Sequence, residues 1–393
     1  MAGRGERPGG LSQGAPVIPY GRHSVDESDI AAVSAVLRGD WLTTGPVVDE
    51  FERALSGHAG GVPCVSVTSG TTALHVAYAA AGIGPGDEVV VTPMTFVATA
   101  AAAAMLGARV VFADVEQDTA NLDPAAAEAA ITTRTKVVTA IDYAGHPADW
   151  DAFRKITEGR DILLLDDAAH ALGSRYRGRP IGSAADLTTF SFFPTKNVTT
   201  AEGGAVAVAD LALLPRVRML RNHGLVRDPL HMRWPDEGGW HQEVHAFSLN
   251  YRLPDLLCAL GVSQLRRLES FKAERARLAA RYAAMLDQVE GIRLPVHRQD
   301  VEVMAHLYPI RVLDGRRKEI YQSMRRSGIG VQVNYVPVYW HPVFSDQGYR
   351  RGLCPNAERF YAEELSLPLY PGLTDQQQGQ VVDGLVAALK GRA

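Results

Sequence analysis

Cysteine is scarce in this sequence. The 393 residues include three cysteines, Cys64, Cys258 and Cys354, which lie far apart and form no CxxC pair. Their spacing argues against a disulfide framework and against a zinc site, and it is compatible with a reducing compartment such as the cytoplasm. We therefore expect no metal centre.

Long hydrophobic runs and an excess of either charge are also lacking. The most apolar stretch, 97–106, consists mainly of alanine and is too short to span a bilayer, so it predicts a helix of small residues packed closely against a sheet. No apolar run follows the N-terminal arginines, which argues against a signal peptide. The net charge of −4 leaves no electrostatic footprint for nucleic acid or for an anionic membrane surface. These features predict a soluble cytoplasmic protein.

What the chain does contain is an alternation of short apolar runs with stretches of helical length. Residues 1–16 are rich in Gly, Arg and Pro and are expected to be disordered. A capping box at Ser24–Glu27 predicts a helix to about Leu37, and Pro46 predicts the start of another. The candidate strands are 64–67, 88–92, 110–113, 137–141 and 162–165. Helical segments between successive strands indicate an α/β fold with a parallel sheet.

The pattern changes after Asp186. Two strand-like runs at 187–192 and 204–208 flank a polar loop, which favours a locally antiparallel arrangement. Residues 254–286 predict one long helix that leaves the large domain. The segments expected beyond it are a strand at 307–312 and helices at 318–327 and 375–389. We therefore expect a large domain over 17–265 and a smaller C-terminal α/β domain over 266–393.

Lysine is rare as well, and one of the six lysines stands apart. Five of them lie beside Arg, Glu or Gly in segments typical of solvated helices or strand edges. Lys196 instead follows the apolar run Ser191–Pro194, between two candidate strands. A partly desolvated amine has a lowered pKa and can act as a nucleophile or form a Schiff base. A solvated hairpin lysine remains the alternative for this segment alone.

A second candidate is the acidic end of the strand at 162–165. Asp166 and Asp167 follow that strand, so they lie at the edge where parallel sheets bind ligands. A carboxylate there could keep the pyridine nitrogen of pyridoxal phosphate protonated, although an Asp that caps the next helix is the common alternative. His170 is expected one turn along the same helix, within reach of the ring hydroxyl, unless it is purely structural.

Two further segments could hold the rest of that cofactor. Thr68–Leu74 follows the first strand and begins a helix, where free backbone amides and Gly70 suit a phosphate. It is not a P-loop, and no GxGxxG follows the first strand, which disfavours a nicotinamide enzyme. Phe96 could stack on a planar ring, or it could be a core aromatic. Each feature is weak alone, but all of them converge on one cofactor.

Together these motifs resemble the sugar aminotransferases of the DegT/DnrJ/EryC/StrS group, which share the aspartate-aminotransferase (fold type I) scaffold. The resemblance extends from about Ile18 to Leu389. The segments that carry it are 19–22, 41–46, 69–71, 167–170, 191–196, 202–204, 221–224 and 250–253. It implies a large, mostly parallel sheet domain that binds pyridoxal phosphate and a smaller C-terminal α/β domain.

The resemblance also implies a role for each site residue. Lys196 matches the Schiff-base lysine, Asp167 the partner of the pyridine nitrogen, and His170 a position near the ring hydroxyl. Phe96 matches the residue that stacks on the ring. The residues that match phosphate contacts are Gly70, Thr71, Thr72 and Ser191. Asn250 matches an asparagine that reaches the phosphate of the neighbouring subunit's cofactor, which implies a homodimer with shared active sites.

Reaction and substrate are implied by the same resemblance. Lys196 favours amino transfer over the dehydratase relatives that carry histidine there, and L-glutamate is the expected donor. Thr199–Gly204 resembles enzymes that aminate carbon 4 of a nucleotide-linked (dTDP or UDP) 4-keto-6-deoxy sugar, although Ala201 stands where glycine is usual. Asn334 replaces a histidine of several relatives. The candidate sugar contacts are Tyr20, Arg252, Tyr335 and His341. The alternatives are amination at carbon 3, a keto-cyclitol or aromatic acceptor, and a non-catalytic regulatory relative.

Overall fold

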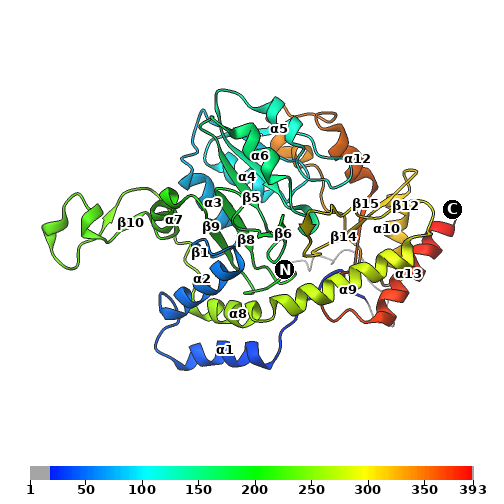
Figure 1. Cartoon of the computed structure of the whole chain (residues 1–393), viewed down its shortest axis with the longest axis horizontal. Coiled ribbons are helices and arrows are strands. Elements are labelled where there is room, and N and C mark those ends of the chain that lie inside the picture. The colour runs from blue at the N-terminus through cyan, green and yellow to red at the C-terminus, as the bar shows by residue number, and fades with distance from the viewer. Residues whose placement is uncertain (1–17, 392–393) are drawn as a thin grey trace, which may run out of the picture.

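The computed structural model describes residues 18–391 and is built around a seven-stranded sheet (Figure 1). The strand order is β1-β9-β8-β5-β4-β2-β3. The strands are β1 (Cys64–Val67), β2 (Glu88–Val91), β3 (Arg109–Phe112), β4 (Thr135–Ile141), β5 (Leu163–Asp167), β8 (Leu187–Ser191) and β9 (Gly204–Val208). All seven were predicted. The segment 1–16, expected to be disordered, lies outside the described residues.

The directions of the strands determine at which edge of the sheet a ligand site is expected. Pairs β2–β3, β2–β4, β4–β5 and β5–β8 are parallel, whereas β9 runs antiparallel to both of its neighbours, β8 and β1. Six strands therefore point the same way and only β9 is reversed, which confirms the antiparallel arrangement predicted after residue 186. The carboxyl ends of the six parallel strands meet at one edge of the sheet, where ligands bind in such folds.

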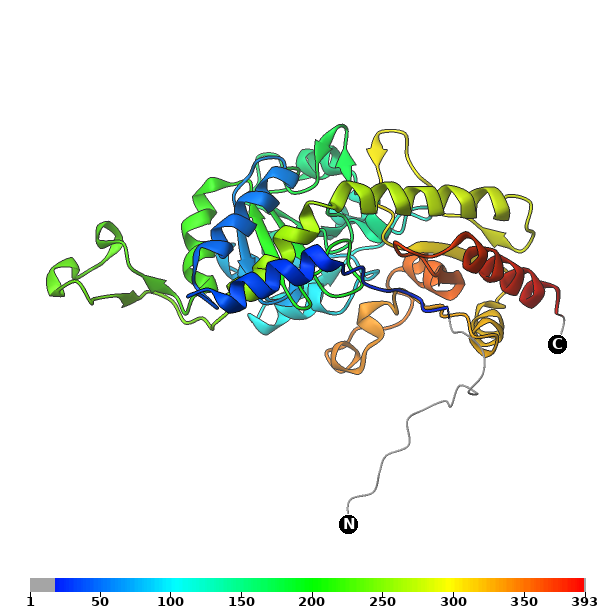
Figure 2. The same ribbon diagram turned by 90° about the horizontal axis from the view of Figure 1, so that it is seen from below.

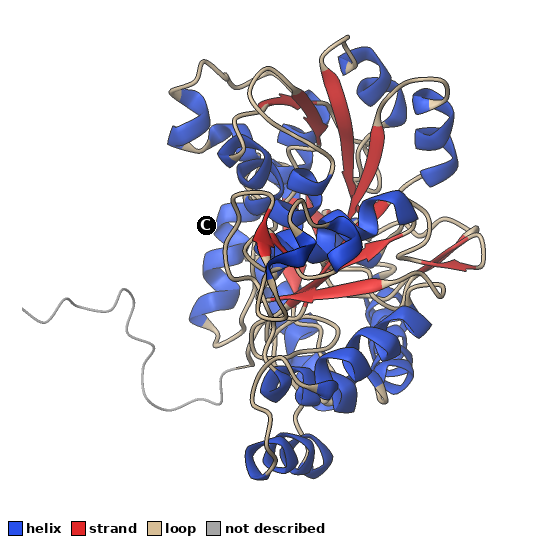
Figure 3. Cartoon of the chain, turned by 90° about the vertical axis from the view of Figure 1, so that its left-hand side faces the viewer, coloured by secondary structure: helices blue, strands red, loops and turns tan. Residues whose placement is uncertain are grey.

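Helices cover both faces of this sheet (Figure 3). Alternate strand residues point to opposite faces, so Val90 and Val138 join one core while Val89 and Val137 join another. The first core is closed by α2 (Pro46–His58), α5 (Pro124–Ala130), α6 (Trp150–Thr157) and α8 (Asp255–Leu265), and the second by α3 (Gly70–Ala80), α4 (Ala98–Met105) and α7 (Leu214–Arg221). Small residues dominate α4, as predicted from its alanine run.

Two helix boundaries differ from the sequence prediction. Helix α1 (Glu27–Arg38) is capped by Asp26, whose carboxylate accepts from the amides of Ser28 and Asp29, and not by Ser24. The predicted helix 254–286 is two helices, α8 and α9 (Leu268–Leu286), separated near Arg267. The Arg267 guanidinium pairs with Asp26 at 2.7 Å, and this contact with α1 favours the local break over a continuous helix.

Helix α9 leads away from the large sheet to the C-terminal part of the chain (Figure 2), which has a hydrophobic core of its own. A three-stranded antiparallel sheet of order β12-β14-β15 lies there with two helices. These elements are β12 (Ile292–Arg293), β14 (Tyr308–Val312), β15 (Glu364–Leu367), α10 (Arg317–Arg326) and α13 (Asp375–Lys390). The predicted strand and both predicted helices are confirmed. Ile18 also joins this core, although the predicted large domain begins at residue 17. The limits of the two domains, 17–265 and 266–393, remain a prediction.

The other elements are short. A small sheet joins β6 (Arg175–Tyr176), β7 (Arg179–Pro180) and β13 (Val301–Glu302), and two short helices, α11 (Pro342–Ser345) and α12 (Pro355–Glu363), follow α10. Between α7 and α8 the chain extends as an arm away from the sheet, with β10 (Leu225–Val226) paired to β11 (Glu243–Val244) (Figures 1 and 2). No helix in the described part of the chain is long and apolar enough to cross a membrane.

Candidate functional site

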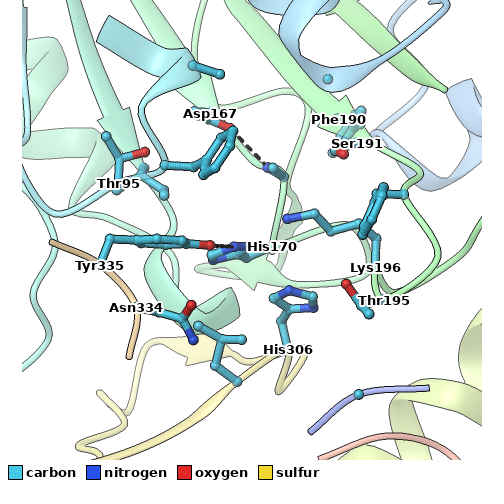
Figure 4. A pocket seen from close by; sticks show the side chains of 18 of the residues that line it. Thr95, Asp167, His170, Phe190, Ser191, Thr195, Lys196, His306, Asn334 and Tyr335 are labelled. Carbon is cyan, nitrogen blue, oxygen red and sulfur yellow. Dashed lines mark hydrogen bonds between the residues drawn. The ribbon is translucent and has the colours of Figure 1, made fainter. Parts of the chain in front are cut away.

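A cavity of about 480 Å³ opens at the carboxyl edge of the parallel strands. That volume is typical of a small-molecule or cofactor site. Side chains from the large sheet and from the C-terminal part of the chain line it together (Figure 4). The predicted site residues that line it are Tyr20, Gly70, Thr71, Phe96, Asp167, His170, Ser191, Lys196 and Tyr335.

Lys196 lies on the loop between β8 and β9, where its amide donates to the carbonyl of Phe193 at 2.9 Å. The amine points into the cavity (Figure 4). Desolvation lowers the pKa of Lys196 from 10.5 to about 8, while the charge of Asp167 acts in the opposite direction. A sizeable fraction of the amine is therefore neutral near physiological pH, as a nucleophile or base requires. The structure disfavours the solvated-hairpin alternative.

Asp167 ends β5 and is buried against the cavity. The Thr99 hydroxyl donates to its Oδ2 at 2.6 Å, and the amide of Ala169 donates to its Oδ1 at 3.3 Å. Burial raises the pKa of Asp167, and the Thr99 bond and the Lys196 charge oppose that shift. A cationic partner stabilises the charged form of such a buried carboxylate, so a cationic group inside the cavity would suit Asp167.

The neighbouring Asp166 cannot play that role. Its side chain is fully buried, both of its carboxylate oxygens lack a hydrogen-bond partner, and it does not line the cavity. Burial raises its pKa well above the ordinary value, with Asp142 and Asp167 adding to the shift. Asp166 therefore lies on the opposite face of β5, away from the cavity, where burial disfavours its charged form.

His170 follows β5 on a turn. The sequence prediction placed it on a helix after the strand, but residues 169–173 form turns and no helix begins there. The Nε2 atom of His170 lies 3.1 Å from the hydroxyl oxygen of Tyr335, and its Nδ1 atom is buried without a partner. Burial holds the pKa of His170 well below its usual value, and the Lys196 charge lowers it further. His170 is a neutral hydrogen-bonding group.

The start of α3 provides an anion site. Ser69 caps the helix by accepting from the amide of Thr72 at 3.1 Å, and the Thr72 hydroxyl donates back to the Ser69 carbonyl at 2.9 Å. Thr72 is thus occupied within its own helix and does not line the cavity. The amides of Gly70 and Thr71 have no acceptor among the described residues. Two free amides at a helix N-terminus suit a phosphate.

Packing explains why residue 70 is a glycine. A Cβ at Gly70 would approach the Cβ of Ser191, on β8, at 2.8 Å, closer than real Cβ atoms come. Ser191 also lines the cavity. The close contact between α3 and β8 therefore depends on the absence of a side chain at this position.

Two aromatic residues, Phe96 and Tyr335, line the cavity next to each other. Phe96 exposes 57% of its side chain at the cavity, and its ring centroid lies 6.2 Å from that of Tyr335. Such an exposed ring beside a cavity can stack on a planar ligand. The core alternative for Phe96 is therefore wrong.

Besides Thr72, three predicted residues lie outside the cavity: Asn250, Arg252 and His341. The exposed Asn250 accepts through Oδ1 from the amide of Arg252 at 3.2 Å, and Arg252 binds Asn222 at the base of the arm. His341 precedes α11. None of the three can contact a ligand in this chain's own cavity from its present position.

Sequence reasoning missed three residues that the structure brings to the site. They are Thr99, Asn197 and His306. Thr99 lies in the alanine run and donates to Asp167. His306 precedes β14 and lines the cavity, and its Nδ1 atom lies next to the Asn197 carboxamide. A lone polar residue in an apolar run is the only signal that could have indicated Thr99. Among residues 18–391 no cluster of His, Cys, Asp and Glu could hold a metal ion.

Comparisons with known proteins agree with this geometry. The model of the DegT/DnrJ/EryC1/StrS aminotransferase family matches residues 23–386. The spore coat polysaccharide biosynthesis protein SpsC of Bacillus subtilis is 36% identical over 380 residues, which cover 95% of this chain and 97% of SpsC. A UDP-4-amino-4,6-dideoxy-N-acetyl-beta-L-altrosamine transaminase of Campylobacter jejuni is 35% identical over 380 residues, which cover 95% of this chain and 98% of that enzyme.

Solved structures are similar as well. Spr1654 of Streptococcus pneumoniae in its PMP form aligns with a TM-score of 0.89 at 31% identity, covering 94% of this chain and 98% of that one. The same protein has been solved in its PLP form.

Proposed function

The chain belongs to the DegT/DnrJ/EryC1/StrS aminotransferase family, and from this premise we propose that it transfers an amino group from L-glutamate to carbon 4 of a nucleotide-linked 4-keto-6-deoxy sugar. The family depends on pyridoxal phosphate. One observation carries the proposal: Lys196 and Asp167 share a cavity with two free helix amides. We place the enzyme in amino-sugar biosynthesis in the cytoplasm.

The residues present fit the cofactor. The amides of Gly70 and Thr71, with Ser191, would hold its phosphate, Phe96 would cover its ring, and Asp167 would pair with its nitrogen. Asp167 has no cationic partner of its own apart from the Lys196 charge, so it is suited to this pairing. When bound, pyridoxal phosphate supplies an electron sink for the charge that develops as a proton leaves the donor's α-carbon.

The chain's own residues supply the proton chemistry. In the first half-reaction the Lys196 amine, with a pKa of about 8, would take the proton from the α-carbon of the amino donor and give it up again before the keto acid leaves. In the second it would deliver a proton to the sugar carbon that receives nitrogen. Thr99 and the amide of Ala169 keep Asp167 in place as an anion. The neutral His170, beside Tyr335, is available to hydrogen-bond the ring hydroxyl.

Two observations support carbon 4. A relative that is 35% identical is named a UDP-4-amino-4,6-dideoxy-N-acetyl-beta-L-altrosamine transaminase. Thr199–Gly204 carries the pattern of enzymes that act on this carbon, and Ala201 has φ 67°, the left-handed region that favours the usual glycine. The loop therefore keeps the backbone conformation that glycine favours, although residue 201 is an alanine.

We further propose a homodimer in which each subunit completes the other's site. Asn250 is exposed and lies outside its own cavity, at the base of the arm. The arm exposes large apolar side chains, with Trp240 84% and Phe247 105% exposed. Burial against a second copy would remove these side chains from water and allow Asn250 to reach the partner's phosphate.

Product analysis tests the proposal. Purified enzyme, L-glutamate and either 4-keto-6-deoxy or 3-keto nucleotide sugars (dTDP and UDP forms) are incubated, and NMR of the product shows which carbon carries nitrogen. We expect nitrogen at carbon 4 only. Amination at carbon 3, or of an inosose in place of the nucleotide sugars, would assign the acceptor differently, and no transfer to any acceptor would indicate a non-catalytic relative.

A further inference from the structure

His306 lies beside the catalytic lysine, although it comes from the C-terminal part of the chain. It lies two residues before the start of β14 at Tyr308, is 7% exposed and lines the same cavity as Lys196 (Figure 4). Its ring stacks on that of His170, with 4.4 Å between the centroids and 27° between the planes. Its backbone is fixed too, because its amide donates to the carbonyl of Ala144 at 3.0 Å. The ring therefore has a defined orientation.

Asn197 determines which ring nitrogen of His306 carries the proton. The Asn197 Nδ2 atom donates to the carbonyls of His170 at 2.8 Å and Leu172 at 3.3 Å. Carbonyls only accept, so this side of the carboxamide must be the nitrogen, and its oxygen must face His306. That oxygen lies 3.1 Å from the Nδ1 atom of His306. Nδ1 therefore bears the proton, and Nε2 carries a lone pair.

His306 stays neutral in this position. Burial lowers its pKa well below the ordinary value, and electrostatic interactions with His170, Lys196 and Arg275 lower it further. The Nε2 atom has no hydrogen-bond partner among the described residues, but it is not among the side-chain atoms sealed from solvent. A neutral acceptor is thus available at the cavity wall.

Lys196 needs such an acceptor. Its amine makes no hydrogen bond among residues 18–391, and the groups that interact electrostatically with it are Asp167, His170 and His306. Asp167 accepts from Thr99 and from the amide of Ala169, and it is the proposed partner of the cofactor nitrogen. The Nε2 atom of His170 is engaged by Tyr335, and its Nδ1 atom is sealed from the cavity. Only Nε2 of His306 remains uncommitted within this set.

We propose that His306 is a positioning residue whose Nε2 atom accepts a hydrogen bond from the Lys196 amine whenever that amine is not bonded to the cofactor, and so aims it for proton transfer. The inference rests on the proposed function, which makes Lys196 the cofactor lysine. Asn197, next to Lys196 in the chain, enforces the arrangement because one carboxamide holds the lysine loop, the His170 turn and the His306 ring together.

Two substitutions separate the two nitrogens of His306. In His306→Gln the amide oxygen can occupy the place of Nε2, so the acceptor for Lys196 is kept while the bond to Asn197 is lost. In His306→Asn the amide nitrogen can donate to Asn197 as Nδ1 does, but the acceptor is lost. A purely structural His306 is replaced better by Asn, whereas an acceptor is replaced better by Gln. His297→Asn, a change to an exposed histidine outside the cavity, is the control.

The first measurement follows the reactivity of the Lys196 amine directly. The rate at which added pyridoxal phosphate becomes linked to the cofactor-free full-length protein is followed by visible absorbance across pH. Because a hydrogen-bond acceptor stabilises the ammonium form, His306→Asn should lower the pH midpoint of this rate, while His306→Gln and His297→Asn should leave it near the wild-type value. The single-turnover rate with L-glutamate should fall at least about tenfold in His306→Asn and much less in His306→Gln. Thermal stability should follow the opposite order.

The outcomes are distinct. If His306→Asn keeps the wild-type pH midpoint and turnover, or if His306→Gln is the more impaired variant by these lysine readouts, the inference is overturned while the proposed function stands. If the wild-type protein does not link pyridoxal phosphate through Lys196, the proposed function fails and the inference falls with it.

Discussion

At the scale of single residues, burial separates two adjacent carboxylates. Asp167 faces the cavity and accepts hydrogen bonds from Thr99 and Ala169, whereas Asp166 is sealed on the other face of β5 with no partner. Only the first is placed to hold a charge next to a ligand. Identical side chains on consecutive residues therefore have different roles because a strand directs them to opposite sides.

This difference predicts unequal effects of the same substitution. Asp167→Asn removes the charge that the cofactor nitrogen needs, so we expect weaker binding of pyridoxal phosphate and a roughly 100-fold slower half-reaction with L-glutamate. Asp166→Asn changes a buried group that does not line the cavity and whose charged form burial already disfavours, so both quantities should change little. Absorbance titrations and stopped-flow traces measure them. A more severe defect in Asp166→Asn would show that the wrong carboxylate is assigned.

Gly70 gives a second prediction. Gly70→Ala places a Cβ 2.8 Å from that of Ser191, and relieving this overlap should cost about 1–3 kcal/mol. It should also move the helix amides, so the affinity for pyridoxal phosphate should fall at least about tenfold. Gly84→Ala meets no atom within 4 Å and is the matched control. Equal affinities in the two variants would argue against a phosphate at the start of α3.

At the scale of elements, the arm is the feature that the sequence did not indicate. Its strands β10 and β11 have two residues each, too short for a clear alternation of apolar and polar residues. Trp240 and Phe247, which this chain leaves exposed, are side chains that the proposed dimer would bury.

Removing that apolar surface should weaken self-association. For the double variant Trp240→Ser/Phe247→Ser we expect a shift from dimer to monomer in sedimentation experiments and a parallel loss of activity, because Asn250 would no longer reach a partner. Leu211→Ser changes a side chain that is 61% exposed outside the arm and should leave the dimer intact. A fully dimeric double variant would place the interface elsewhere.

At the scale of the whole molecule, the sequence predicts the sheet well and the site in part. Every strand of the large sheet lies in a short strand-like run of its own, and side chains that follow parallel strands necessarily meet at one edge. The sequence does not show the turn that holds His170, the break near Arg267, or the position of His306 against the lysine loop. These depend on contacts between segments about 110 to 240 residues apart, which local patterns do not encode.

The most direct measurement concerns the covalent link to the cofactor. The protein, loaded with pyridoxal phosphate, is reduced with borohydride, digested and analysed by mass spectrometry. We predict that one lysine, Lys196, carries the reduced cofactor, and that Lys196→Arg protein carries none. Labelling of any other of the six lysines, or the absence of labelled peptide in the wild-type digest, would contradict the account.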